Sequence, residues 1–308
     1  MPSEIGAFSL ITSETPWIVV GPKRHVGTAV REVWEARGVV RALVRREISS
    51  RYRGSVFGFA WAVFKPLMQL VLFSVVIGKF LGASKSIEDY SIFIFVSLMV
   101  WGFFSECISG GATSITSSAA LITKVSFPRE ILPLSRVIIG GYNFLVQIPV
   151  LIIGFAIAGI WPPISNVVLI IPIAFAAILF ALSAALILSA INVYARDTQH
   201  LVEVLLMLFL YLSPIMYSWT FVWNAVQERF GSELFFKIYM LNPISSIVIE
   251  FQDLLWGGDR FYSDGSIASD LIGTGTLTYW GLPIFGLIGF YFAYRLFLRL
   301  EPNFAREL

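Results

Sequence analysis

Six long apolar stretches constrain the fold of this chain more than any other feature. They cover residues 61–82, 91–110, 138–160, 167–191, 201–221 and 277–298. A helix needs about 20 mostly apolar residues to cross the roughly 30 Å hydrocarbon core of a bilayer. Lipid offers no partners for free backbone groups, so helices are the expected spanning structure. The sequence therefore predicts an all-α integral membrane protein with six transmembrane helices.

Composition and charge placement support this prediction and orient the chain. Apolar residues make up 57% of the chain and charged residues only 14%, against about 25% charged residues in soluble domains. Mean hydropathy is +0.78. If the termini are cytoplasmic and the six spans alternate, 17 of the 22 lysines and arginines lie inside, and only Lys79, Lys85, Arg229, Lys237 and Arg260 lie outside. Positive charge accumulates on cytoplasmic loops, which favours this orientation.

The chain divides into a tail, an amphipathic segment and a spanning domain. Residues 1–27 are predicted to be an N-terminal tail. Residues 28–58 carry apolar side chains at three- and four-residue spacing and a basic stripe of Arg37, Arg41 and Arg45. That pattern predicts a cytoplasmic amphipathic interface helix in the plane of the lipid headgroups; alternatively, it only supplies orienting charge. Residues 59–300 are predicted to form the six-span transmembrane domain, and 301–308 a C-terminal tail.

Three connections between the apolar stretches stand out. On the inner side, residues 114–124 suggest a short helix that stops at Phe127-Pro128, and a charged turn at Arg196-Asp197 precedes a helix broken at Ser213-Pro214. On the outer side, residues 222–276 are interpreted as two short re-entrant helices that dip partly into the membrane between spans five and six. Asn242-Pro243 and the charges of Glu250 and Asp253 argue against a seventh crossing.

The sequence offers little for catalysis. It contains no GxxxxGK[ST] phosphate-binding loop, and no cluster of His, Cys and carboxylates has metal-ligand spacing. A charge at mid-bilayer costs about 2.5–3.5 kcal/mol, and Glu106 and Glu203 fall near the inner ends of spans, which disfavours a proton relay. We therefore expect no catalytic residues, no metal and no nucleic-acid partner.

Aromatic residues are abundant, with 9 Trp, 11 Tyr and 27 Phe. Aromatic faces pack against sugars and acyl chains, while Tyr and Trp keep a polar edge. Most of these rings are explained by lipid contact or interfacial anchoring. A minority is predicted to line a channel: Trp61, Trp101, Phe104, Tyr211 and Tyr217.

Four passages carry a resemblance to a known family. They are REISSRYRGSVFGFAWAVFKPL (46–67), LITKVSFPREILPLS (121–135), NVYARDTQHLVEVLLMLFLYLSPIMY (192–217) and LNPISSIVIEFQDLLW (241–256). The chain resembles the membrane subunits of type-2 ABC exporters, specifically polysaccharide, O-antigen and teichoic-acid export permeases. The resemblance implies a homodimer in the bacterial plasma (inner) membrane, driven by two copies of a separate ABC ATPase that binds ATP and magnesium. No cofactor is expected in this chain.

The resemblance also implies roles for particular residues. The outer gate would include Asn242, Pro243, Glu250 and Asp253. ATPase coupling would involve the amphipathic helix, the 114–124 segment and the 192–200 turn, where Arg196 and Asp197 form a local ion pair or helix cap. The coupling residues are Arg45, Arg46, Glu47, Ile122, Lys124, Phe127, Arg129, Glu130, Arg196 and Asp197.

The expected cargo is a polyprenyl-pyrophosphate-linked glycan, whose anionic head group meets the inner side. Arg51, Arg53 and Lys65 flank the first span and are predicted to bind that head group through charge-assisted hydrogen bonds; alternatively, they only orient the span. Other interpretations are an ABC exporter of drugs or simple lipids, an intramembrane lipid-linked sugar transferase, and a secondary transporter. The sequence shows no convergent catalytic cluster for the transferase and no mid-span charges for the secondary transporter.

Overall fold

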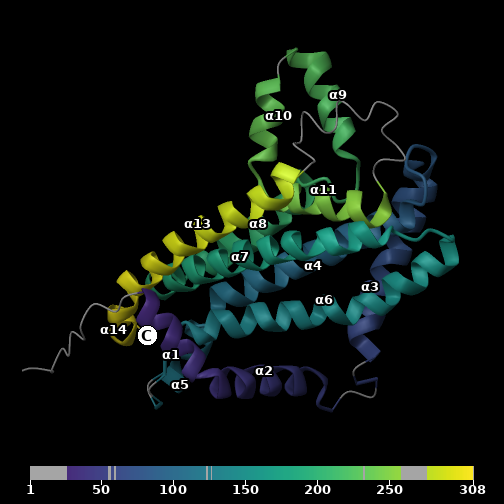
Figure 1. Ribbon diagram of the computed structural model, residues 1–308. Helices are drawn as coiled ribbons and strands as arrows, with labels where there is room; N and C mark the ends of the chain where they lie inside the picture. Colours follow the sequence, from purple (N-terminus) through teal and green to yellow (C-terminus); the bar gives the residue numbers. More distant parts are fainter. Residues whose placement is uncertain are drawn as a thin grey trace, which may run out of the picture.

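The computed structural model describes residues 26–54, 57–58, 60–122, 124–125, 127–231, 233–257 and 276–307. Within these ranges the chain is helical and contains no strand (Figure 1). The predicted tail before residue 26 and the part of the outer segment at 258–275 lie outside the described residues. The elements are α1 (Val26–Glu35), α2 (Arg37–Tyr52), α3 (Ala60–Phe73), η1 (Ser74–Phe80), η2 (Ala83–Lys85), α4 (Tyr90–Thr113), η3 (Thr116–Ser118), α5 (Ala119–Ile122), α6 (Ile131–Ala158), α7 (Ile164–Tyr194), α8 (Thr198–Leu212), α9 (Trp219–Phe230), α10 (Glu233–Met240), α11 (Pro243–Trp256), α13 (Thr276–Leu300), η5 (Glu301–Asn303) and α14 (Phe304–Glu307).

Within the described ranges, five helical segments are long and apolar enough to cross a membrane. They are Ala60–Phe80, Tyr90–Thr113, Ile131–Ala158, Ile164–Tyr194 and Tyr279–Asn303. Each overlaps one of the predicted spans. A sixth crossing arises only if α10 and α11, which are bent by 86° at their junction, count as one broken span.

The predicted span 201–221 is not one helix. α8 has 15 residues, so it is about 22 Å long at 1.5 Å per residue, which is shorter than the hydrocarbon core. It ends because Ser213 adopts an extended conformation with ψ 150°, as expected for a residue that precedes proline. The chain then resumes as α9 at Trp219. The sequence located the break correctly but extended the span across it.

α4 is the centre of the subunit. In its apolar window 72% of the residues are buried, and it packs between α6, α7 and α11. Close approach depends on small residues. A Cβ on Gly111 would lie 2.5 Å from the Cβ of Ala185 on α7, and one on Gly140 of α6 would lie 2.5 Å from the Cys107 Sγ on α4. Small residues at such crossings let membrane helices approach closely.

α3 and α8 leave broad apolar faces uncovered. No residue in the apolar window of the Ala60–Phe80 segment is buried, and Met68, Val71 and Leu72 are each more than half exposed. On α8, Met207 and Tyr211 are 65% and 59% exposed. Since these helices belong to a membrane protein, either lipid or another subunit covers those faces.

The single amphipathic helix predicted for residues 28–58 is two helices. α1 and α2 are separated at Ala36, and α2 ends at Tyr52, before an extended Arg53 and a left-handed Gly54 with φ +78°. α2 lies beside the first half of α6 in Figure 1. Its predicted position in the headgroup plane stays a prediction.

A second apolar cluster lies where the predicted inner ends of the helices meet. It joins Ala29 of α1, Leu132 of α6, Val193 of α7, Phe297 of α13 and Phe304 of α14. Ile122 and Phe127 of the short inner connection pack against its edge. The predicted short helix at 114–124 is observed only as η3 followed by α5.

The outer segment contains more helix than the sequence suggested. α9 and α10 stand side by side in Figure 1, with α11 beneath them, so the described part holds three helices where two were predicted. Trp219, Phe236 and Ile249 form a small apolar cluster between them. Whether these helices dip into the membrane stays a prediction.

Candidate coupling surface and transport path

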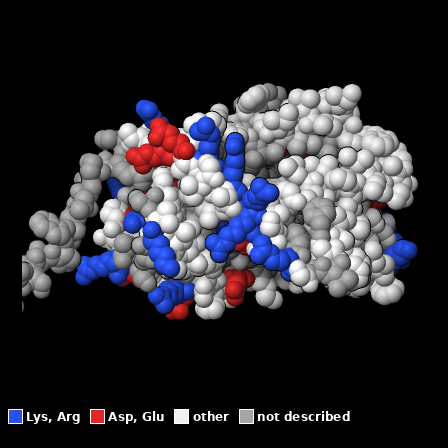
Figure 2. Space-filling model, turned by 90° about the horizontal axis from the view of Figure 1, so that it is seen from below, with Lys and Arg blue, Asp and Glu red and all other residues white. Residues whose placement is uncertain are grey.

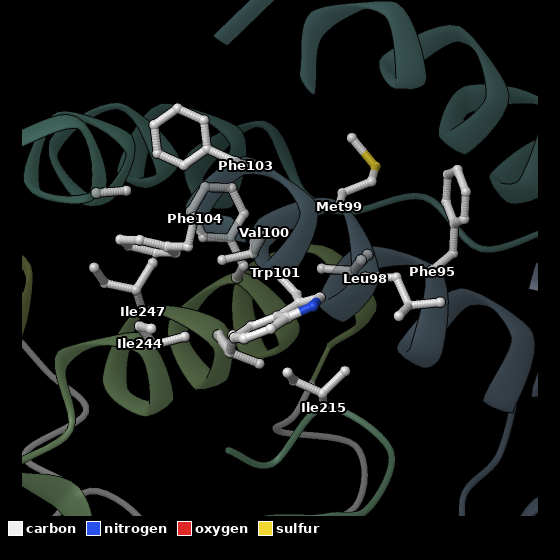
Figure 3. Close-up of a cluster of buried hydrophobic side chains, with 14 of the residues drawn as sticks. Phe95, Leu98, Met99, Val100, Trp101, Phe103, Phe104, Ile215, Ile244 and Ile247 are labelled. Atoms are coloured by element: carbon white, nitrogen blue, oxygen red, sulfur yellow. The ribbon is translucent and has the colours of Figure 1, made fainter. Parts of the chain in front are cut away.

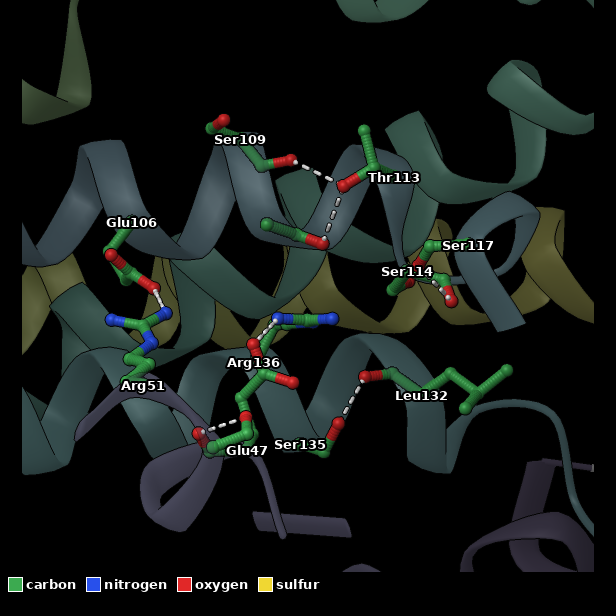
Figure 4. A network of polar contacts seen from close by, with 12 residues as sticks. Glu47, Arg51, Glu106, Ser109, Thr113, Ser114, Ser117, Leu132, Ser135 and Arg136 are labelled. Atoms are coloured by element: carbon green, nitrogen blue, oxygen red, sulfur yellow. Dashed lines mark hydrogen bonds and ion pairs between the residues drawn. The ribbon is translucent and has the colours of Figure 1, made fainter. Parts of the chain in front are cut away.

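Two ion pairs attach α2 to the spanning helices. The Arg136 Nη1 of α6 donates to the Glu47 Oε1 of α2 at 2.8 Å. Four residues further along α2, Arg51 pairs with Glu106 of α4 (Figure 4). All four side chains are about one-fifth to one-third exposed. The two pairs therefore connect α2 to both α4 and α6.

Sequence reasoning missed Arg136 and Glu106 as partners of α2. A usable signal existed for Glu106, because a carboxylate inside an apolar span needs a partner or water. The sequence did not indicate which cation would pair with it, since Arg51 lies 55 residues earlier in the chain.

A polar cavity of about 460 Å³ separates α2 from the 114–121 segment and the start of α6. Ser50, Ser117 and Ser118 line it together with Arg46 and Arg136. Ser114 also lines it, and its hydroxyl is buried without a hydrogen-bond partner among the described residues. The two elements that the sequence predicts to meet an ATPase thus form the walls of one polar cleft.

Two predicted coupling residues are turned inward. Glu130 is only 2% exposed, and Tyr294 of α13 donates a hydrogen bond to it at 3.4 Å. The Arg129 Nη1 donates to the backbone oxygen of Glu301 at 2.9 Å. These two residues connect the start of α6 to the C-terminal segment, and their proposed ATPase contact stays a prediction.

Other predicted coupling residues lie on the surface. Arg45, Arg46, Lys124, Arg196 and Asp197 are exposed, and Glu47 is half-buried in its ion pair. Seen from below in Figure 2, Lys and Arg gather over the middle and one end of the face that carries α2. The predicted Arg196–Asp197 ion pair is not formed, since neither side chain is ion-paired within the described part of the chain. Asp197 does occupy the N-cap position of α8, but its side chain makes no capping hydrogen bond.

The three predicted head-group residues are not equivalent. Arg51 is already engaged by Glu106. Arg53 and Lys65 are exposed, and neither forms an ion pair in the described ranges. Their binding of a substrate head group stays a prediction.

The predicted channel aromatics fall into two groups. Trp61 is 36% exposed on α3, in edge contact with Phe57 and Phe64. Tyr211 is exposed, and the half-buried Tyr217 donates to the Tyr211 carbonyl at 2.8 Å.

Trp101 and Phe104 are instead 8% and 1% exposed inside the subunit. They pack there beside Ile215, Ile244 and Ile247 (Figure 3). In this arrangement they support the core, so a channel role for them requires another conformation and stays a prediction.

Hydrogen bonds from α11 and its cap hold the segment at which α8 ends. The Asn242 side chain caps α11 by accepting from the Ile244 N–H at 3.1 Å, and it donates to the Ser213 Oγ at 2.9 Å. The buried Gln252 donates to the Pro214 carbonyl at 2.8 Å and to the Ser97 Oγ of α4 at 2.7 Å. The predicted outer segment is thus bound to the end of α8, and Gln252 was missed because an isolated glutamine carries no pattern.

The other predicted gate residues lie on the same helix, α11. Pro243 occupies the first turn of α11, where its missing N–H costs nothing. Glu250 is 1% exposed, and neither carboxylate oxygen has a hydrogen-bond partner among the described residues. Asp253 is half-buried one turn further on. Their role as a gate stays a prediction.

No group of three or more His, Cys, Asp or Glu that could hold a metal occurs among the described residues. The chain instead presents apolar spanning helices, a basic face and a helix ion-paired to two spans. These features define a multi-pass membrane protein.

Comparison with known proteins identifies the family of this chain. The model of the ABC-2 type transporter family matches residues 38–251. An O-antigen export system permease protein RfbA of Myxococcus xanthus is 34% identical over 231 residues, covering 74% of this chain and 84% of that protein. The Klebsiella pneumoniae protein of the same name is 30% identical over 252 residues, covering 82% of this chain and 92% of its own.

The chain therefore belongs to the ABC-2 type transporter family. It is a multi-pass protein of the bacterial inner membrane. As a permease subunit of this family it is a non-catalytic membrane component, and the family implies an ABC ATPase partner.

Proposed function

We propose that this chain is the membrane subunit of an ATP-driven exporter that moves a lipid-linked polysaccharide from the cytoplasmic to the outer side of the inner membrane. The observation that carries the proposal is similarity to two O-antigen export permeases over 84% and 92% of their own lengths. Relatives that align over most of their lengths share a fold, which supports a common class of cargo.

The ATPase would dock on the face formed by α2 and the 114–125 connection. Two observations support this location. Arg46 and Lys124 are exposed there, and the Glu47–Arg136 and Arg51–Glu106 pairs connect α2 to α6 and α4. Movement of the ATPase would displace α2 and carry the inner ends of both helices with it.

Two copies of the chain would enclose the path. α3 and α8 expose the apolar faces expected for contact with a second subunit, and they carry Trp61 and Tyr211. A pyrophosphate head group would meet Arg53 and Lys65, whose positive charges are unpaired in the described ranges. The outer segment 222–276, whose α11 is hydrogen-bonded to the break at Ser213-Pro214, would be the outer gate.

The proposal is tested with the purified chain and its ATPase reconstituted in liposomes. Adding a polyprenyl-pyrophosphate-linked O-antigen-type glycan should stimulate ATP hydrolysis and place glycan in the opposite compartment. Stimulation by small hydrophobic drugs but not by glycan would reject the polysaccharide and favour a drug exporter. Substitution of Arg53 and Lys65 by Gln should lower glycan-stimulated hydrolysis while leaving ATPase binding intact.

Docking is tested by one charge reversal and a matched control. Lys124→Glu changes an exposed residue of the proposed docking face, whereas Lys85→Glu makes the same change in η2, outside that face. We expect Lys124→Glu alone to reduce the amount of ATPase that co-purifies, by about tenfold for one lost charge-assisted contact of about 1.5 kcal/mol. Equal co-purification of both variants would place the ATPase elsewhere.

A further inference from the structure

An apolar groove of about 490 Å³ runs between α6 and α7. α6 contributes Ile138, Gly141 and Leu145, α7 contributes Ala177 and Ile178, and the buried Phe103 of α4 lies at its base. Ile138, Leu145 and Ile178 are 41%, 61% and 44% exposed, so the groove opens sideways from the spanning helices. Its volume is within the roughly 300–1,000 Å³ typical of small-molecule sites.

One end of this groove is basic. Val44 and Ile48 of α2, together with Ile138, line both the groove and an adjoining pocket that includes Arg41 and Arg45. Both arginines are exposed, and neither forms an ion pair in the described part of the chain. Ile138 lies two turns from the start of α6 and Leu145 two turns further, so the groove leads from the basic end into the apolar span.

An apolar groove with a basic end indicates which kind of molecule binds there. Water does not fill an apolar groove that opens into lipid, so a hydrocarbon chain is its natural filling. Two guanidinium groups without an ion-pair partner at the end of such a groove attract an anion. Arginine binds phosphate oxygens through paired hydrogen bonds. A second copy of this chain that placed its own α2 on this face would bring like charges together.

We infer that the groove between α2, α6 and α7 binds an anionic phospholipid of the bilayer. The phosphate group lies at Arg41 and Arg45, and one acyl chain follows Ile138, Gly141 and Leu145 along α6. With the orientation that the charge distribution indicates, the lipid belongs to the cytoplasmic leaflet. This site is separate from the proposed glycan path, which uses α3 and α8.

The bound lipid would fix the remaining side of α2. Glu47 and Arg51 already attach this helix to α6 and α4, while Arg41 and Arg45 have no protein anchor in the described residues. A phospholipid that bridges these arginines and the α6–α7 groove completes the attachment. Membranes rich in anionic lipid would therefore hold α2 more firmly.

The test uses the full-length chain, delipidated in detergent and titrated in native mass spectrometry with phosphatidylglycerol or phosphatidylethanolamine of the same acyl chains. Phosphatidylglycerol should bind more tightly. The double substitution R41Q/R45Q should weaken phosphatidylglycerol binding by about 30-fold, from the attraction that anionic lipid exerts on two basic residues, and leave phosphatidylethanolamine binding unchanged. The control R295Q/R299Q removes equal charge from α13 and should leave both affinities unchanged.

A second pair of variants tests the groove. A Cβ on Gly141 meets no atom within 4 Å, so G141L places a side chain in the groove without a clash at its base. G141L should weaken the binding of both lipids. L145W, at the exposed rim, should have the same effect from an independent position. The inference is overturned if R41Q/R45Q binds phosphatidylglycerol like the control, if neither groove variant weakens binding, or if the native protein retains lipid-linked glycan there in place of phospholipid.

Discussion

At the scale of single residues, the pairing of Arg51 with Glu106 changes how the inner side of this permease is understood. Arg51 is attractive as a head-group ligand because it flanks the first span, but its guanidinium is committed to a carboxylate on α4. Removing its charge would therefore do two things at once, since it also leaves Glu106 unpaired inside an apolar helix. Loss of export in an Arg51 variant would not by itself demonstrate substrate binding.

A charge-swap experiment separates these effects. Arg51→Glu and Glu106→Arg should each lower the temperature of unfolding in detergent, and the two together should recover part of the loss. We expect a coupling free energy of about 1 kcal/mol, the upper range for partly exposed pairs. The Arg31–Glu35 pair of α1 provides the control, because both its side chains are more than half exposed.

Swapping Arg31 and Glu35 should give no measurable coupling. Equal coupling in the two cycles, or none in the Arg51–Glu106 cycle, would show that this contact does not hold α2 to α4.

Single residues also show which features could be predicted from the sequence and which could not. Apolar length identified the spans, and Asn242-Pro243 was interpreted as a break in the outer segment. The structure shows that this dipeptide caps and begins α11. The partners of Glu106, Glu130 and Gln252 are all more than 35 residues away in sequence. No local pattern encodes such contacts, so the sequence indicated that a charge needed a partner but not which one.

At the scale of helices, close contact at glycines holds α4 within the bundle. A Cβ on Gly111 would lie 2.5 Å from the Ala185 Cβ and 2.9 Å from its Cα, so the helix itself would have to move. Gly141 on α6 is also in a helix interior, but a Cβ there meets nothing within 4 Å. An alanine at Gly111 therefore tests helix packing, whereas an alanine at Gly141 tests helix propensity alone.

Gly111→Ala should destabilise the subunit by about 1–3 kcal/mol, the usual cost of overpacking, and lower its unfolding temperature in detergent. Gly141→Ala should leave that temperature unchanged or raise it slightly, because alanine favours helix. If both variants were equally stable, α4 and α7 would not be as close as described.

Helix boundaries also separate what local sequence encodes from what tertiary packing decides. Ser213-Pro214 ends α8 for a local steric reason, and this was readable. The division of the amphipathic segment into α1 and α2 at Ala36 was not, because the helical apolar spacing continues through it. There the break coincides with α1 joining the cluster around Ala29 and Phe297, while α2 turns along α6.

At the scale of the whole molecule, one subunit leaves its first span almost bare. The Ala60–Phe80 segment buries none of its apolar window, whereas the Tyr90–Thr113 segment buries 72%. Lipid alone is able to cover such a face. The proposed exporter, however, needs a path for a hydrophilic glycan between subunits, so α3 of one copy should meet α8 of the other.

Cysteine crosslinking tests this arrangement directly. Cys107 is fully buried, so the native thiol is shielded from oxidants and the wild-type background is suitable. Met68→Cys on α3 should crosslink, between two copies in membranes, with cysteines placed in turn at Val204, Met207, Leu208 and Tyr211 on α8. A disulfide needs Cα atoms within about 7 Å, so dimers should recur at three- and four-residue intervals, the period of one helix face.

The matched control uses an equally exposed apolar position on a helix outside the proposed interface. Ile152 on α6 is 48% exposed, close to the 51% of Met68. Ile152→Cys should give no dimer with the same α8 series. Dimers that form equally with Met68→Cys and Ile152→Cys would indicate random collision in the bilayer, and their absence from the whole Met68 series would place the subunit contact, and with it the glycan path, on other helices.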